Sequence, residues 1–165
     1  MKRVNLLFAA ATWLLASTIV VRAEDPAAQI IGVWKVISNS NKELATGKVN
    51  YPLGQNPAGY VVYTKGGHII FSLIAGDRAK QAGASATDAE RVALYNTLAA
   101  GSGTYKVDGN TLTVTYDTSW LQTWTGTTQK RKIAFSGNRV TFTSEPTKFS
   151  DGREIVFEVV YERVE

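Results

Sequence analysis

Three short turns built around glycine limit the folds that this sequence can adopt. Each joins two stretches in which apolar and polar residues alternate, and the turns are Lys65-Gly66-Gly67, Asp108-Gly109-Asn110 and Ser136-Gly137-Asn138. Tight turns of this composition connect antiparallel strands, because glycine and asparagine tolerate the positive φ angles that such turns require. The sequence therefore predicts an antiparallel sheet assembled from hairpins.

Alternating patterns recur along the rest of the chain and predict eight strands. The strands are expected at roughly 32–40, 59–64, 68–74, 103–107, 111–118, 127–134, 139–144 and 153–163. Eight strands in one domain are typical of a closed barrel or a sandwich. In an up-and-down order the three tight turns fall at one end and the long connections at the other. One end is then closed and the other is a mouth.

One helix is expected between the third and fourth strands. Thr87-Asp88-Ala89-Glu90 has the pattern of a capping box, and Gly101 can end the helix about four turns later. Val92, Tyr95 and Leu98 recur at helical spacing, which is more typical of core packing than of a cofactor-binding segment. We expect this helix, over residues 87–100, to cover part of the mouth.

The first residues have the pattern of a secretory signal. Lys2 and Arg3 precede an apolar run over residues 6–21, and Val21-Arg22-Ala23 suits a signal peptidase. The alternative is an uncleaved membrane anchor, because the apolar run approaches the roughly 20 residues that span a bilayer. We expect residues 1–23 to be a signal peptide that exports the chain to the periplasm or the medium, with no stable membrane insertion after cleavage.

The remaining residues, 24–165, are expected to form one domain. The full chain carries a formal net charge of +4, and removing the three cations of the signal segment leaves +1. So small a charge creates no field that would attract nucleic acid or anionic lipid. The chain has no cysteine and one histidine, so we expect no disulfide, no zinc or iron site and no cofactor.

The single histidine, His68, directly follows the Gly66-Gly67 turn. Ile69, Phe71 and Leu73 form an apolar set that is expected to face the barrel interior, so alternation turns His68 outward at the closed end. We therefore expect no catalytic role for His68. Binding groups are expected on the loops of the opposite rim.

Four runs of sequence carry further information, namely IGVWKVIS, YPLGQNPAGYVVYTKGGHI, WTGTTQKRKI and DGREIVFEVVYERV. Together they resemble the bacterial lipocalin-like domain family. Gly32-Val33-Trp34 is similar to the G-x-W signature of lipocalins, and Arg163 resembles the arginine that lipocalins pack against that tryptophan. The resemblance implies an all-β fold, an eight-stranded antiparallel up-and-down barrel with one inserted helix. It also implies a structural contact between Trp34 and Arg163 that closes the barrel, and it implies no single activity.

The strand over residues 127–134 has an unusual polar pattern. Gln129 and Arg131 share one face, and Lys130 and Lys132 share the other. Two lysines are harder to bury than one arginine, so we expect Gln129 and Arg131 to line the barrel. Arg131 could bind a ligand carboxylate through two hydrogen bonds. Equally, it could bond backbone carbonyls, tyrosine hydroxyls and water in a wet cavity.

Aromatic residues complete the candidate binding site. Trp120 and Trp124 lie in a long loop at the mouth, where they could form an aromatic rim for an apolar ligand or a hydrophobic plug. Tyr60 lies near the rim and is compatible with either a structural or a ligand-facing position. The candidate ligand-binding residues are Tyr60, Phe71, Tyr116, Trp120, Trp124, Gln129, Arg131 and Phe157.

These features favour a periplasmic or secreted protein that binds a small, mostly apolar or amphipathic molecule, with acids among the candidates. One alternative is an isomerase or cyclase that uses the same cavity, with Tyr60 or Tyr116 as acid and Arg131 stabilising an oxyanion. Another is a structural envelope or interaction module whose barrel is filled by its own side chains. No nucleophile, base and orienting group can be recognised together, so the sequence favours a binding protein over an enzyme.

Overall fold

The structure is a computed structural model, and it describes residues 25–165. The expected signal peptide, residues 1–23, lies outside the described residues. Within residues 25–165, no helix has the length and apolar character needed to cross a membrane.

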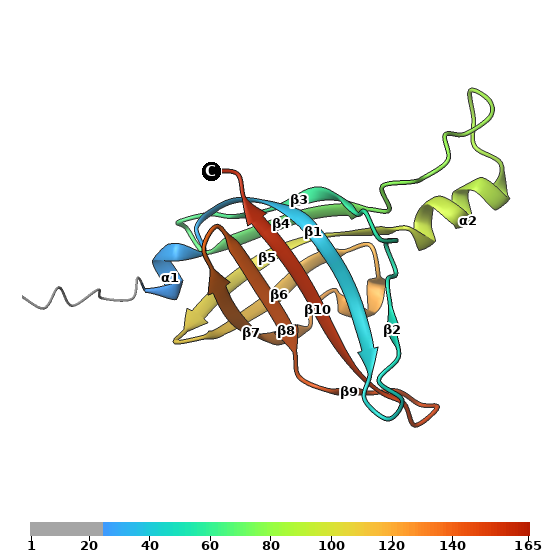
Figure 1. The fold of residues 1–165 in the computed structure, drawn as a ribbon. Coiled ribbons are helices and arrows are strands. Elements are labelled where there is room, and N and C mark those ends of the chain that lie inside the picture. Colours follow the sequence, from blue (N-terminus) through green and yellow to red (C-terminus); the bar gives the residue numbers. More distant parts are fainter. Residues whose placement is uncertain (1–24) are drawn as a thin grey trace, which may run out of the picture.

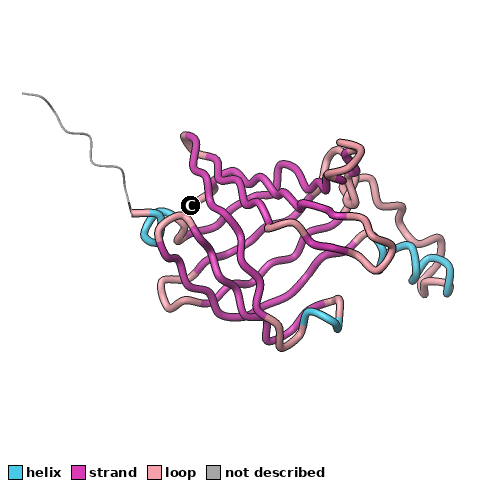
Figure 2. The backbone as a smooth tube through the Cα atoms, turned by 90° about the horizontal axis from the view of Figure 1, so that it is seen from below, coloured by secondary structure: helices cyan, strands magenta, loops and turns pink. Residues whose placement is uncertain are grey.

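The described chain forms a closed antiparallel barrel (Figures 1 and 2). Each barrel strand pairs with its neighbours in antiparallel fashion, and the first and last strands pair with each other from Trp34 opposite Arg163 to Glu43 opposite Ile155. This pairing closes the sheet and confirms the expected eight-stranded barrel. Its strands are β1 (Gly32–Glu43), β3 (Ala58–Tyr63), β4 (His68–Ile74), β5 (Leu98–Asp108), β6 (Thr111–Ser119), β7 (Thr128–Ser136), β8 (Arg139–Ser144) and β10 (Glu154–Arg163).

Two further strands lie at the mouth and were not expected from the sequence. β2 (Val49–Asn50) pairs with the end of β1, and β9 (Thr147–Lys148) pairs with the beginning of β10. Two residues are too few to show an alternating pattern, so neither strand has a sequence signal. The longer helix, α2 (Asp88–Asn96), lies between β4 and β5 and not between the third and fourth strands in chain order. The unexpected strand β2 precedes β4 and β5 and raises their numbers by one.

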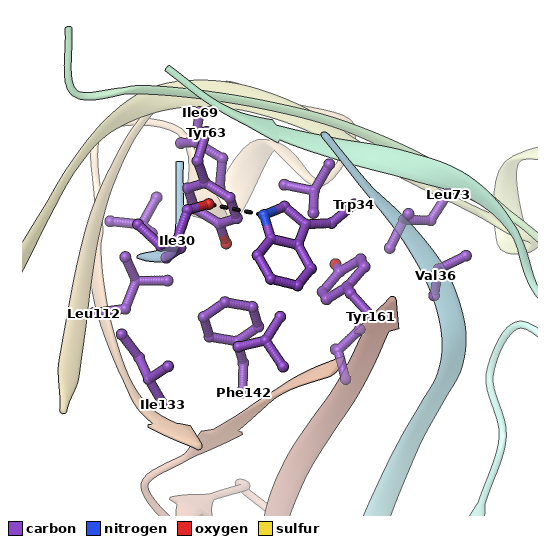
Figure 3. Close-up of a cluster of buried hydrophobic side chains, with 14 of the residues drawn as sticks. Ile30, Trp34, Val36, Tyr63, Ile69, Leu73, Leu112, Ile133, Phe142 and Tyr161 are labelled. Carbon is purple, nitrogen blue, oxygen red and sulfur yellow. Dashed lines mark hydrogen bonds between the residues drawn. The ribbon is translucent and has the colours of Figure 1, made fainter. Parts of the chain in front are cut away.

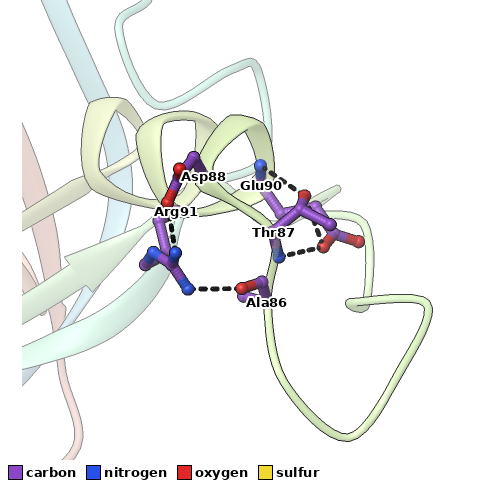
Figure 4. A network of polar contacts seen from close by, with 5 residues as sticks. All are labelled: Ala86, Thr87, Asp88, Glu90 and Arg91. Atoms are coloured by element: carbon purple, nitrogen blue, oxygen red, sulfur yellow. Dashed lines mark hydrogen bonds and ion pairs between the residues drawn. The ribbon is translucent and has the colours of Figure 1, made fainter.

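Helix α2 begins where the sequence indicated and ends earlier. The Thr87 hydroxyl accepts a hydrogen bond from the backbone of Glu90, and the Glu90 carboxylate accepts one from the backbone of Thr87 at 2.7 Å (Figure 4). The expected end near Gly101 is wrong, because residues 98–101 extend β5 and pair with β4. Backbone pairing along a neighbouring strand overrides the helical tendency of Leu98, Ala99 and Ala100, whose residue types favour helices.

The expected packing of α2 into the core is also wrong. No residue of the helix is buried, and Val92 and Tyr95 remain 59% and 48% exposed. Figure 1 shows the helix projecting away from the barrel beyond the ends of β4 and β5. Its apolar residues therefore do not contribute to the stability of the barrel core.

A short helix, α1 (Pro26–Gln29), closes the end opposite the mouth. The Asp25 side chain caps its N-terminus, and Ile30, directly after it, is completely buried. The indole Nε1 of Trp34 donates a 2.7 Å hydrogen bond to the Ile30 carbonyl (Figure 3). The helix thus holds Ile30 as part of the barrel floor.

Arg163 fastens this floor from the last strand. Its guanidinium lies 4.2 Å from the centre of the Trp34 ring, so the structure contains the contact that the family resemblance implied. The same guanidinium donates hydrogen bonds to the carbonyls of Gln29 and Ile31, the latter at 3.0 Å. Arg163 therefore joins α1, β1 and β10 at the closed end.

The inward and outward faces follow the predicted alternation. Ile69 and Leu73 are buried in the interior, whereas His68 is exposed on the outer face beside its turn. His68 is therefore remote from the barrel interior, as expected.

Candidate functional site: a polar centre in an aromatic cavity

The barrel encloses a cavity of about 880 Å³, whose lining extends from Trp120 at the mouth to Ile69 and Leu112 beside the tight turns. Its floor is formed by Tyr63, Phe142 and Tyr161, whose rings pack against one another in Figure 3. Trp34 and Ile133 belong to the packed core and do not line the cavity. The volume lies within the roughly 300–1,000 Å³ range of small-molecule sites. It disfavours the alternative of a barrel filled by its own side chains.

Arg131 and Gln129 enter this cavity from β7, as the polar pattern predicted. Both are half-buried, while Lys130 and Lys132 between and beyond them are exposed. An Nη2 atom of Arg131 donates a 3.2 Å hydrogen bond to the Gln129 side-chain oxygen. The guanidinium is thereby oriented while most of its donors remain free for another group.

No acidic side chain of residues 25–165 forms an ion pair with Arg131. Glu145 is the one acidic residue among the described cavity residues. It follows Ser144, which pairs with Arg131 at the end of β8. The centre of the cavity therefore carries a positive charge that the described protein does not neutralise.

Three tyrosines line the same cavity as Arg131. In the described part of the chain, the side-chain hydroxyls of Tyr63, Tyr116 and Tyr161 form no hydrogen bond with a protein group, whereas the Tyr105 hydroxyl donates to the Thr64 carbonyl at 2.8 Å. The three hydroxyls also keep some contact with solvent, since Arg78 Nε is the one side-chain nitrogen or oxygen atom of residues 25–165 that is fully buried and has no hydrogen-bond partner. They are available to hydrogen-bond a molecule in the cavity.

Burial controls the protonation of two of these tyrosines. Loss of solvation raises the pKa of Tyr63 and Tyr161 well above the ordinary value, and the positive charge of Arg131 only partly offsets the shift. Both phenols therefore keep their protons at neutral pH and act as hydrogen-bond donors. Neither can serve as a general base there.

Because the pKa values of Tyr63 and Tyr161 are raised by burial, the stability of the protein at alkaline pH tests whether these tyrosines are buried. An unfolded tyrosine loses its proton near pH 10, whereas Tyr63 and Tyr161 keep theirs in the folded chain. The folded state then binds more protons, so the free energy of unfolding should fall as the pH rises above about 10. Urea unfolding across that range should show a smaller fall in Tyr63→Phe and Tyr161→Phe. An unchanged slope in both variants would contradict the assignment.

A chain of aromatic rings forms the mouth side of the cavity. Trp120 and Trp124 lie in the loop over residues 120–127, which contains the 3-10 helix η1 (Gln122–Trp124). Their rings meet edge to face with ring centres 5.0 Å apart. Trp124 lies 5.5 Å from Tyr116, which in turn lies 6.1 Å from Phe71. This row of aromatic rings extends from the rim of the mouth to the wall formed by β4.

Most of the expected ligand-binding residues are brought together in this cavity. Its lining contains seven of them, namely Phe71, Tyr116, Trp120, Trp124, Gln129, Arg131 and Phe157. Tyr60 is the exception and requires a correction, because it is 50% exposed on the outer face, where it pairs with Lys35 and Ser72. Val61 and Tyr63 are the inward residues of β3. Tyr60 therefore cannot act as an acid in the cavity.

The sequence reasoning did not identify Tyr63, Phe142 and Tyr161 as site residues. Alternation alone could have placed all three on the inner face, since Tyr161 shares a face with Phe157 on β10. Their depth could not be read from the sequence, because it depends on strand register around the whole barrel.

The fold and the cavity together define a calyx-shaped barrel of the kind that binds small molecules. The chain belongs to the lipocalin-like domain family, whose model matches residues 31–164. A comparison with curated proteins finds no match. Among residues 25–165, no group of histidine, aspartate and glutamate side chains could hold a metal ion.

Proposed function

We propose that this protein binds a small, mostly apolar organic anion, with the anionic group at Arg131. The observation that carries the proposal is a half-buried guanidinium that forms no ion pair with an acidic side chain of residues 25–165. It lines the same cavity as three tyrosines whose hydroxyls form no hydrogen bond within the described chain. Leaving such groups unpaired in a low-dielectric site is costly, and a carboxylate would satisfy several of them at once.

The polar centre supports binding better than catalysis. Tyr63 and Tyr161 are held in their protonated form. The described cavity lining contains no histidine, and its one acid, Glu145, forms no ion pair with Arg131. A guanidinium and protonated phenols can donate hydrogen bonds to an anion, and neither group can take a proton from a substrate at neutral pH. We further propose that binding occurs outside the cytoplasm, on the basis of the signal pattern in residues 1–23.

Paired acids and esters test the role of Arg131. In Arg131→Leu, the affinities for naphthoate and undecanoate should fall by about tenfold or more, because a charge-assisted hydrogen bond contributes on the order of 1.5–3 kcal/mol. The affinities for the neutral methyl esters should change much less, since an ester carries no negative charge to pair with the guanidinium. Isothermal titration calorimetry measures all four.

Lys132→Leu is the matched control, because it removes one positive charge from the outer face of the same strand. It should leave all four affinities nearly unchanged, as surface charges contribute little. Equal weakening of acids and esters in Arg131→Leu would reduce Arg131 to a packing residue and defeat the proposal.

A further inference from the structure

We propose that the preferred ligands are planar aromatic carboxylic acids rather than saturated fatty acids. This inference rests on the proposed function, since it assumes that Arg131 binds the carboxylate. It goes further by proposing that the hydrocarbon part of the ligand is a planar aromatic ring system. The observation behind it is the arrangement of aromatic rings above and below the guanidinium.

Strand register places Arg131 between two groups of rings. Going along β7 toward the closed end, Arg131 pairs with Leu112 of β6, and Ile133, two residues further on, pairs with Phe142 of β8. Phe142 belongs to the floor group with Tyr63 and Tyr161. On the side of the mouth, Val114 pairs with Gln129, and Tyr116 follows it on the same inner face.

Tyr116 begins the second group, which continues through Trp124 to Trp120. Both groups contribute to the lining of the one cavity. A carboxylate on Arg131 would therefore bring its hydrocarbon part against ring faces and edges in either direction.

Rings of this kind discriminate between ligands by shape. Aromatic pairs prefer offset stacking or edge-to-face contact and gain affinity beyond the area that they bury. A flat, rigid ring can adopt these geometries without ordering rotatable bonds, whereas an alkyl chain must freeze several of them. The lining thus favours planar ligands over flexible ones of equal size.

The mouth group is held in place by hydrogen bonds as well as by ring contacts. The Tyr95 hydroxyl donates to the Trp120 carbonyl at 2.8 Å, and the Thr127 hydroxyl donates to the Trp124 carbonyl at 2.7 Å. The Trp124 backbone N–H donates to the Leu121 carbonyl at 2.9 Å. A preformed wall costs little ordering on binding, which strengthens the preference for a rigid ligand.

Three acids with the same number of carbon atoms provide the test, namely naphthoate, decahydronaphthoate and undecanoate. Calorimetric titration of the protein should show naphthoate binding at least about tenfold more tightly than either saturated acid, because one aromatic contact is worth about 2- to 12-fold in affinity. Burial of apolar area alone favours undecanoate, which has the most apolar surface, so the expected order runs against simple hydrophobicity.

A substitution in the mouth group tests whether its aromatic rings cause the preference for naphthoate. Trp124→Leu should weaken naphthoate by about 2- to 12-fold and leave undecanoate within about twofold, since only the aromatic ligand loses a ring contact. Tyr60→Leu is the control, because Tyr60 is an exposed aromatic residue on the outer face. It should change neither affinity.

The inference is overturned if a saturated acid binds as tightly as naphthoate or more tightly. It is also overturned if Trp124→Leu weakens all three acids equally. In both cases the proposed function still stands, because an organic anion binds. If none of the three acids binds the folded protein, the proposed function itself fails.

Discussion

Replacing Trp34 with alanine is expected to lower the free energy of unfolding by about 3–5 kcal/mol, the range for truncating a large buried aromatic residue. The indole is 1% exposed, and it packs 6.1 Å from the Phe135 ring and beneath the Arg163 guanidinium. The substitution also leaves the Ile30 carbonyl without its hydrogen bond from Nε1. Urea unfolding followed by circular dichroism measures the loss. A loss below about 1 kcal/mol would contradict the assignment of Trp34 to the barrel floor.

A double-mutant cycle separates the contact with Arg163 from the rest of this effect. A guanidinium over an indole contributes about 0.5–2 kcal/mol, so Trp34→Ala and Arg163→Ala should be less damaging together than the sum of their single effects. Arg163→Ala should also leave ligand affinity unchanged in the protein that remains folded, because Arg163 lies at the opposite end from the mouth. Additive effects would show that Arg163 stabilises the floor only through its bonds to the Gln29 and Ile31 carbonyls.

Most of the barrel could be predicted from the sequence because its signals are local. Alternation located the strands, and each glycine turn marked a hairpin end, so β4 and β8 have the bounds that were expected. The inward position of Arg131 followed from comparing two lysines with one arginine on opposite faces of one strand. These inferences need only the period of a strand and the cost of burying charge.

The misplaced features depend on longer-range information. The end of α2 is set by residues 98–101 pairing with β4, and nothing within the helical segment signals that competition. Tyr60 was considered for the cavity because it lies near the rim, although the alternation of β3 directs it outward. The cavity floor is formed by Tyr63, Phe142 and Tyr161, which lie on three different strands. The relative heights of these strands are set by the register of the closed barrel. Depth along a barrel is thus the property that sequence patterns leave least determined.

Reversing the charge at the centre of the cavity is expected to reverse its ligand preference. In Arg131→Glu, the affinity for naphthoate should fall on the order of 100-fold or more, because an attractive charge-assisted pair is replaced by two like charges, which costs several kcal/mol. Naphthylmethylammonium, a cation of similar shape, should gain affinity. The new carboxylate can accept hydrogen bonds from neighbouring tyrosine hydroxyls, so we expect the variant to fold.

Lys132→Glu is the control for net charge, because it makes the same charge change on an exposed position of the same strand. Calorimetry should show little change in the affinity of this variant for either ligand, since an exposed charge is screened by solvent and salt. Equal losses of naphthoate affinity in both variants would mean that the anion responds to the overall charge of the protein. A folded Arg131→Glu variant that retains naphthoate and gains no cation would place the binding site elsewhere than at Arg131.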